Sequence, residues 1–294
     1  MANLKEVRTR IASVSSTQQI TSAMKMVSAA KFRRAQNAIL GMRPYAAQLG
    51  AIMADIDIED GVQTPYHETR AVNRVLLVVV TSNKGLCGAF NSNVIKEANA
   101  RLKHYKSQDT VPEVKMITLG KRATELFSRL KELVVESHDD LLDTPTFDSI
   151  CLLCDSIMQS FCDKTYDKVE IIYNQFKNSL TQILSTEQFL PVVTNAAAAE
   201  SDHKDAVRND YIYEPGKVQI LKEMVPMTLR SQFYRIILDS LAAEHGARMT
   251  AMQKATDNAT ELLKELRLSY NKARQAAITN EIIEIVSGSE ALKS

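Results

Sequence analysis

The stretch MQKATDNATELLKELRLSYNKARQAAITNEIIEIVSG, residues 252–288, repeats small and apolar side chains at alternating steps of three and four residues. Steps of this kind average about 3.5 residues, so the stripe stays on one side of a helix only when that helix coils left-handedly around a partner. No proline occurs between Met227 and Ser287, and Gly246 is the only glycine there. We therefore predict a long coiled-coil helix, with a seam formed by Met252, Ala255, Ala259, Leu262, Leu266, Ser269, Ala273, Ala276, Asn280 and Ile283.

The partner helix is predicted at the other end of the chain, which opens on a second heptad stripe without glycine or proline before Gly41. This stripe comprises Leu4, Val7, Ile11 and Val14 and, after a stutter, Ile20, Ala23, Met24, Val27, Ala30 and Ala38. Many seam positions are alanine or serine, which let two backbones approach closely but bury less apolar area than leucine. We predict an antiparallel coiled coil; periodicity alone also allows two long helices that close a helical bundle.

Between the two helices the pattern changes to alternating strands and helices. The run Val75–Thr81 is continuously apolar and rich in β-branched residues, as in a parallel strand covered on both faces. Further strands are predicted at 114–118, 133–136, 168–173 and, antiparallel, 182–190, with helices at 92–106, 121–130 and 146–163. We predict a Rossmann-like α/β domain at 74–215, a linker at 61–73, coiled-coil helices at 1–60 and 216–288, and a tail at 289–294. Residues 196–210 are predicted to form a surface loop.

The composition is that of an ordinary water-soluble protein, with 294 residues, 45% hydrophobic residues and a net charge of +1. Residues 1–50 carry eight basic side chains against Glu6 alone, whereas residues 51–216 hold 17 basic and 25 acidic ones. The basic helix favours an acidic partner, although a solvated basic face is the simpler alternative. No secretory or transit segment precedes the helical pattern, and no apolar run is long enough to span a bilayer, so we expect a cytosolic chain.

The first strand-to-helix turn, Thr81–Asn91, is the place to look for nucleotide binding. Gly85 and Gly88 resemble a phosphate-binding turn, but Lys84 precedes both glycines and no serine or threonine follows them as a P-loop requires. We interpret the segment as a tight structural turn, with nucleotide binding as the weaker alternative.

Other candidates for chemistry are isolated. Cys151 and Cys154 form a C-x-x-C pair inside an amphipathic helix, without a second pair to complete a zinc site. We interpret both as buried core thiols, and Asp139 and Asp140 as loop residues. Among the scattered histidines only His245, in the long C-terminal helix, attracts interest. The sequence predicts no catalytic residues, no metal site and no cofactor.

Three blocks of sequence, in order, resemble the gamma subunit of the rotary F-type ATP synthase in its bacterial form, and the resemblance covers essentially the whole chain. The blocks are IASV with TQQITSAMKMV and AAKFRRAQ (11–36), TSNKGLCGAFN (81–91), and ARMTAM, ATDNA, YNKARQ and ITNEIIEIVSG (247–288). Departures from the family pattern are Gly246 before the Ala-Arg-Met stretch and Ser289 after Gly288. Pro226 suggests a kink or a late helix start. The cysteine-bearing regulatory loop of chloroplast members is absent.

The resemblance implies a non-catalytic central-stalk rotor subunit. Its coiled coil would lie inside a hexamer of alternating alpha and beta subunits, and its α/β domain would sit with epsilon on the c-ring. The chain would couple ion flow through that ring to ATP synthesis or hydrolysis on the beta subunits. We expect peripheral association with the cytoplasmic face of the bacterial plasma membrane, through the complex, and no nucleic-acid partner.

The resemblance also implies which residues contact the beta subunits: Arg248, Gln275, Thr279 and Glu281, with Met24 packing nearby. The alternative is that these are ordinary seam or surface residues of a helix. Two other functional classes stay open on the sequence: a nucleotide-binding enzyme with a helical appendage, and a basic coiled-coil adaptor for nucleic acid or membranes.

Overall fold

A computed structural model describes residues 4–60, 64–108, 111–129, 133–178, 181–192, 214 and 216–291. The described chain begins with the long helix α1 (Leu4–Asp60) and ends with the longer helix α6 (Lys217–Ala291). It divides into two compact units, and each is described by itself. Unit 1 comprises Met1–Ala29 and Arg248–Ser294, and unit 2 comprises Ala30–Ala247.

Unit 2 is built on a five-stranded sheet with the strand order β3-β2-β1-β4-β5. The strands are β1 (Arg74–Val80), β2 (Glu113–Leu119), β3 (Val134–Ser137), β4 (Lys168–Phe176) and β5 (Gln182–Leu190). The first four run parallel, with Val78 level with Ile117 on one side and Ile171 on the other, whereas β5 pairs antiparallel with β4. The Rossmann-like arrangement and the antiparallel last strand are both confirmed.

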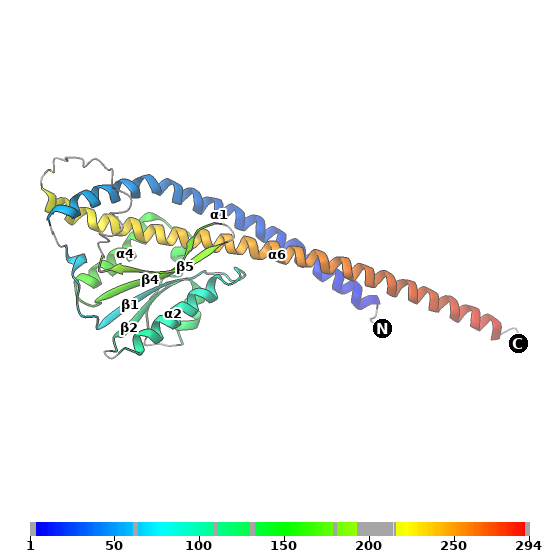
Figure 1. Cartoon of the computed structure of the whole chain (residues 1–294). Helices are drawn as coiled ribbons and strands as arrows, with labels where there is room; N and C mark the ends of the chain where they lie inside the picture. The colour runs from blue at the N-terminus through cyan, green and yellow to red at the C-terminus, as the bar shows by residue number, and fades with distance from the viewer. Residues whose placement is uncertain are drawn as a thin grey trace. The chain divides into compact units, whose positions relative to one another are not determined.

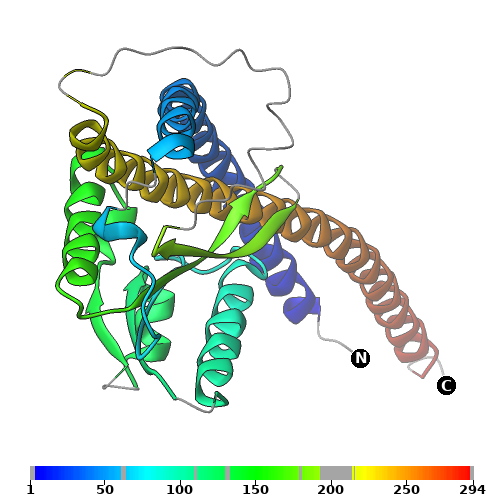
Figure 2. The same ribbon diagram turned by 60° about the vertical axis from the view of Figure 1, so that its left-hand side comes forward.

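Helices cover both faces of this sheet (Figures 1 and 2). On one face, α2 (Phe90–Lys106) and α3 (Lys121–Phe127) pack on alternate residues of β1 such as Val75, Leu77 and Val79. On the other face, α4 (Phe147–Cys162) and α6 pack on Leu76, Val78 and Val80. Every residue from Val75 to Val80 is therefore buried, which explains the unbroken apolar run.

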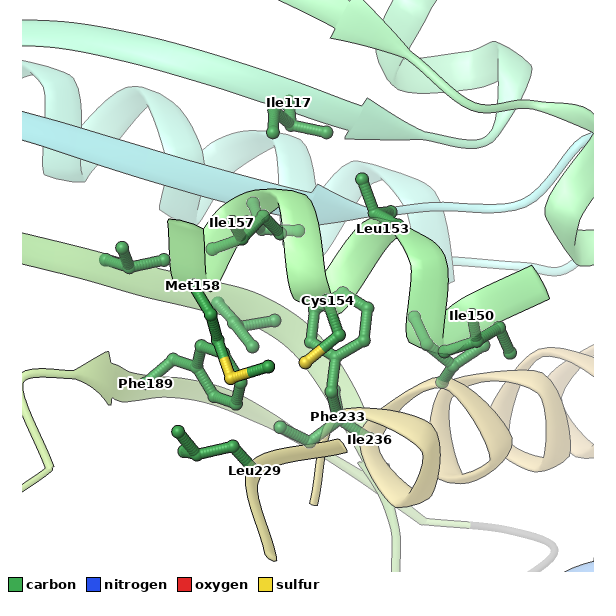
Figure 3. Close-up of a cluster of buried hydrophobic side chains, with 14 of the residues drawn as sticks. Ile117, Ile150, Leu153, Cys154, Ile157, Met158, Phe189, Leu229, Phe233 and Ile236 are labelled. Atoms are coloured by element: carbon green, nitrogen blue, oxygen red, sulfur yellow. The ribbon is translucent and has the colours of Figure 1, made fainter. Parts of the chain in front are cut away.

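The larger core lies between the sheet, α4 and α6 (Figure 3). Phe233 of α6 and Phe189 of β5 place their ring centroids 5.5 Å apart, at 53°. Ile157 and Met158 of α4 belong to the same core. The α6 helix thus contributes to two structures: its first part packs on the sheet in unit 2, and its later part belongs to unit 1.

The predicted elements of the α/β domain all occur, with small shifts at their ends. The helix predicted at 92–106 begins at Phe90, and the helix predicted at 121–130 ends at Phe127. The two short connecting helices η1 (Pro65–His67) and η2 (Asp140–Leu142) were not predicted. Asp140 therefore begins a turn of 3₁₀ helix. The surface loop predicted at 196–210 lies outside the described residues.

Two expectations about α6 can be checked against its bounds. The late helix start suggested by Pro226 is wrong, because α6 begins at Lys217 and continues through the proline. Val225 and Leu229 beside it are each 2% exposed, and burial of such an apolar face sustains a helix across a poor helix former. The helix also continues through Gly246, so that glycine does not break it.

Candidate functional site

The coiled coil of unit 1 is antiparallel, and two hydrogen bonds define its register. The Thr21 and Thr256 hydroxyl oxygens lie 2.8 Å apart, and Gln18 Nε2 donates to Thr260 Oγ1 at 2.7 Å. Residue numbers rise along α1 as they fall along α6. The same register places Val14 level with Leu263.

The seam of α1 follows one unbroken heptad pattern, so the predicted stutter after Val14 is wrong. The residues withdrawn from solvent include Leu4, Val7, Ile11, Val14, Gln18, Thr21, Lys25, Ser28, Phe32, Ala35, Ile39, Met42, Ala46 and Leu49. Of the residues assigned to the seam after the stutter, Ile20, Ala23, Val27 and Ala30 are exposed, whereas Met24 and Ala38 are half-buried. Apolar seam residues before and after this stretch hold the helix in phase, which turns polar side chains inward between them.

The seam of α6 is also shifted from the prediction, by one residue at every second position. Met252, Ala259, Leu266 and Ala273 are buried or half-buried as predicted, and so is Ala255. The other predicted seam residues are exposed: Leu262, Ser269, Ala276, Asn280 and Ile283. The seam instead includes Leu263, Tyr270 and Ala277, each one residue further along, and it includes Thr256 beside Ala255. The three-then-four spacing allows either set. Tyr270 in place of Ser269 gives more apolar burial, and Thr256 meets Thr21.

The outward face of α1 in unit 1 exposes three large apolar side chains among polar ones. Ile20, Met26 and Val27 are 56%, 65% and 59% exposed. Ile20 lies two residues after the seam residue Gln18, and Val27 lies two residues after the seam residue Lys25. Two residues correspond to about 200° around a helix, so both side chains face away from the seam. After Glu6 the sequence has no acidic residue before Asp55, so the charged side chains of α1 nearest to these apolar residues are basic. Exposed apolar side chains on a helix with basic charges form a surface suited to a partner that has both apolar and acidic groups.

The end of α6 is a single exposed helix rich in isoleucine. Residues 274–289 are all exposed except Ala277, which is half-buried, and they extend over about 24 Å. The large apolar side chains exposed here are Ile278, Ile282, Ile283, Ile285 and Val286. Apolar side chains at this density around a helix indicate a surface that another molecule covers.

The five residues expected to contact beta subunits all lie in unit 1, but they do not form one cluster. Gln275, Thr279 and Glu281 are exposed near the end of α6, and Thr279 donates its hydroxyl hydrogen to the Gln275 carbonyl at 2.9 Å. Arg248 is only 7% exposed and lies about 40 Å along the helix from Gln275. Met24 is half-buried on α1. The structure therefore assigns them to separate positions along the coil.

Comparison with known proteins decides the family. The family model described as ATP synthase matches residues 3–292. A protein named ATP synthase gamma chain from Flavobacterium johnsoniae is 52% identical over 99% of both chains, and one from Cytophaga hutchinsonii is 50% identical over the whole of both. The chain belongs to the ATP synthase gamma chain family. The resemblance stated from the three sequence blocks is confirmed.

Solved structures show the same fold. The central stalk and c-ring of the Tetrahymena thermophila mitochondrial ATP synthase contain a chain with a TM-score of 0.60 and 25% identity, matched over 80% of this chain and 99% of that one. A chain of the Euglena gracilis mitochondrial ATP synthase rotor gives a TM-score of 0.65 at 19% identity, over 94% and 98%. The gamma-family architecture of two long helices and an α/β domain is thus present here.

The turn after β1 is closed by its own side chains. Asn91 Oδ1 accepts a hydrogen bond from the Ser82 amide at 3.0 Å, and Asn91 Nδ2 donates to Cys87 Sγ at 3.2 Å. Cys87 is buried against Phe90 and Ala243, in unit 2. Leu86 and Gly88 have positive φ angles of 64° and 61°, which reverse the chain so that Cys87 points inward. This packing supports the interpretation as a structural turn.

The C-x-x-C pair is part of the core, as predicted. Cys154 is fully buried beside Phe233 and Cys151 is 8% exposed, and both are free thiols (Figure 3). Burial raises the pKa of both thiols above the usual range, which suppresses the reactive thiolate. Within the described residues, no group of three or more histidine, cysteine or acidic side chains is arranged to hold a metal ion. No helix in the described ranges is long and apolar enough to cross a membrane.

Proposed function

We propose that this chain is the central-stalk rotor subunit of an F-type ATP synthase, non-catalytic itself, which couples ion flow through a c-ring to ATP synthesis or hydrolysis on beta subunits. Full-length similarity to ATP synthase gamma chains supports the proposal. The Tetrahymena and Euglena structures with the same fold are described as central stalk and rotor.

The single structural observation that carries the proposal is the exposed apolar surface of unit 1. The isoleucine-rich end of α6 and the outward face of α1 at Ile20 and Val27 leave large apolar side chains in solvent. Such a surface is costly unless another molecule covers it. A hexamer of alternating alpha and beta subunits, with the coil on its axis, would cover both regions.

The remaining partners and the location follow from the same proposal. The α/β domain of unit 2 would sit with the epsilon subunit on the c-ring, at the cytoplasmic face of the bacterial plasma membrane, and the chain would associate with that membrane only through the complex. The coiled-coil helices 1–60 and 216–288, the α/β domain 74–215 and the linker between them are proposed as its functional parts. Gln275, Thr279, Glu281, Arg248 and Met24 are proposed as positions that contact beta subunits.

Reconstitution tests the assignment. The purified chain is mixed with the alpha and beta subunits of the same organism, separated by gel filtration and assayed for ATP hydrolysis. We expect the chain to co-elute with both subunits in a complex that hydrolyses ATP. A variant carrying Ile282→Asp and Ile285→Asp places two charges on the apolar end and is expected to assemble poorly, whereas Lys272→Asp serves as a control. Elution of the unaltered chain alone would contradict the proposal.

A further inference from the structure

The outward side of α4, in unit 2, is acidic with one leucine at its centre. Residues at steps of four and three along this helix share one side of it, and here they are Asp148, Leu152, Asp155 and Gln159. We call these four residues the α4 stripe. Leu152 is 73% exposed, similar to Ile285 of the isoleucine-rich end at 72%. A leucine this exposed in the middle of a polar stripe is a candidate contact residue.

An aromatic pair and a hollow adjoin the α4 stripe at the start of the helix. Phe147 is 42% exposed, and its ring meets that of Tyr234 of α6 edge-on, with centroids 5.3 Å apart at 85°. The same end of α4 borders a hollow of about 390 Å³ that reaches back to the turn after β3. The lining of the hollow is mostly polar and includes Ser137, His138, Asp139, Asp140, Thr146 and Ser149. Apolar side chains and a polar hollow thus lie next to each other, as in contact sites.

The charges that this part of the chain contributes are of one sign. No lysine or arginine occurs between Lys131 and Lys164, whereas that interval contains eight acidic residues. Asp155 is neutralised by its ion pair with a residue of α6. Asp140 and Asp148 are exposed and make no ion pair within the described residues. Uncompensated carboxylates attract a basic partner and repel anionic lipid and nucleic acid.

We propose that the α4 stripe and the hollow beside it form a docking surface for a basic segment of another protein subunit. A lysine or arginine of the partner enters the hollow near Asp140, and an apolar side chain of the partner packs on Leu152. Association buries the leucine and pairs the free carboxylates, and both effects favour the complex. This inference rests on the proposed rotor function, because the assembled enzyme supplies the partner. It gives unit 2 a contact surface that is separate from the coiled coil.

Photo-cross-linking in the assembled enzyme tests this surface. Leu152 is replaced by the photoreactive amino acid p-benzoylphenylalanine, and the enzyme is isolated in membrane vesicles through a tag on its beta subunits. After irradiation, mass spectrometry identifies the segment that is joined to position 152. Leu126, an exposed leucine of α3, receives the same replacement as a control, because α3 packs on the opposite face of the sheet.

We expect position 152 to be joined to another subunit, in a segment with more basic than acidic residues. Asp140→Lys combined with Asp148→Lys should lower the yield of this cross-link by about fivefold or more, because like charges then face each other. Glu113→Lys combined with Glu125→Lys makes the same charge change at exposed carboxylates away from α4 and should leave the yield unchanged. A thermal melt of each purified variant shows that it folds.

The same preparations separate this inference from the proposed function. If the isolated enzyme contains the chain but position 152 gives no cross-link, the rotor function stands and the docking surface is rejected. A cross-link to lipid, to a second copy of this chain or to an acidic segment also overturns the docking surface, and so does a yield that Asp140→Lys with Asp148→Lys does not lower. If the chain does not co-purify with the beta subunits, the rotor function fails and the docking surface fails with it.

Discussion

Arg230 of α6 and Asp155 of α4 form a two-point ion pair, with Nε 2.7 Å from Oδ1 and Nη2 3.1 Å from Oδ2. The hydrogen bonds to Asp155 raise the pKa of Arg230 further above its usual range. Because both residues lie in unit 2, this contact ties the first part of α6 to a helix that packs on the sheet. Torque delivered to α6 would reach the α/β domain through this contact and the apolar core beside it.

Removal of this ion pair is expected to destabilise unit 2 modestly. Both side chains are about two-fifths exposed, so Arg230→Ala should lower the free energy of unfolding by about 1 kcal/mol or less. Arg230→Lys should recover only part of the loss, because lysine cannot make two parallel bonds. Urea denaturation, followed by circular dichroism, measures the free energy of unfolding of both Arg230 variants. Arg122→Ala, which breaks the more exposed pair with Glu125, is the control; an equal effect there would remove the special role of Arg230.

Alanine substitutions at two glycines should change the stability of the fold in opposite directions. Gly120 has a φ of 101°, and a Cβ there would lie 2.4 Å from the Thr81 carbonyl oxygen, so Gly120→Ala should cost about 2 kcal/mol or more. Gly41 lies within α1 with nothing near a Cβ, so Gly41→Ala should stabilise by about 0.5–1 kcal/mol. Thermal melts of both variants check the pair. A melting temperature raised by Gly120→Ala would be incompatible with the described turn.

The buried thiol of Cys154 should make stability fall at alkaline pH. Burial, with Asp155 as a smaller cause, raises its pKa in the folded state, whereas in the unfolded chain it ionises near 9.0. The folded state then holds a proton that the unfolded state has lost, so stability is lost as pH rises above about 9, by up to about 1.4 kcal/mol per pH unit. Cys154→Ala should flatten this decline, measured by urea denaturation at several pH values. Ser156→Ala, on the exposed side of α4, should leave the decline as steep as before.

Variants at the proposed beta-contacting positions should impair coupling more than assembly. Gln275 is exposed, so Gln275→Ala should leave the fold intact and lower ATP synthesis in membrane vesicles. Arg248→Ala combined with Gln275→Ala should lower it further, but Arg248 is buried, so this variant also needs a thermal melt. Asn271→Ala, an exposed position on the same helix, is the control. Unchanged synthesis by the double variant would remove these two residues from the contact.

The sequence predicted the α/β domain well because its signals are local. The apolar run of β1 and the spacing of α4 each report burial on faces that the same segment defines, and strand β5 has the predicted bounds. In such a domain the sequence predicts least well where each helix and strand ends. Those ends depend on caps and neighbours, such as Gly120 at the start of α3.

The coiled-coil seam was harder to predict because hydrophobicity points to the wrong side of α1. Ile20 and Val27 are more apolar than Thr21 and Ser28, yet the polar residues are inside. The signal that identifies the seam is the unbroken alternation of three and four residues from Leu4 to Leu49, which continues through polar side chains without a stutter. Sequence reasoning also missed the hydrogen bonds that join Gln18 to Thr260 and Thr21 to Thr256, because each joins residues more than 200 positions apart.

Direct observation of rotation tests the central claim. In a complex of this chain with alpha and beta subunits, immobilised through the beta subunits, a bead attached at Lys103 of the α/β domain is followed under the microscope after ATP is added. A rotor subunit predicts continuous rotation in one direction that stops when ATP is removed. Steady ATP hydrolysis by a complex that contains the chain, with a bead that does not turn, would contradict the claim.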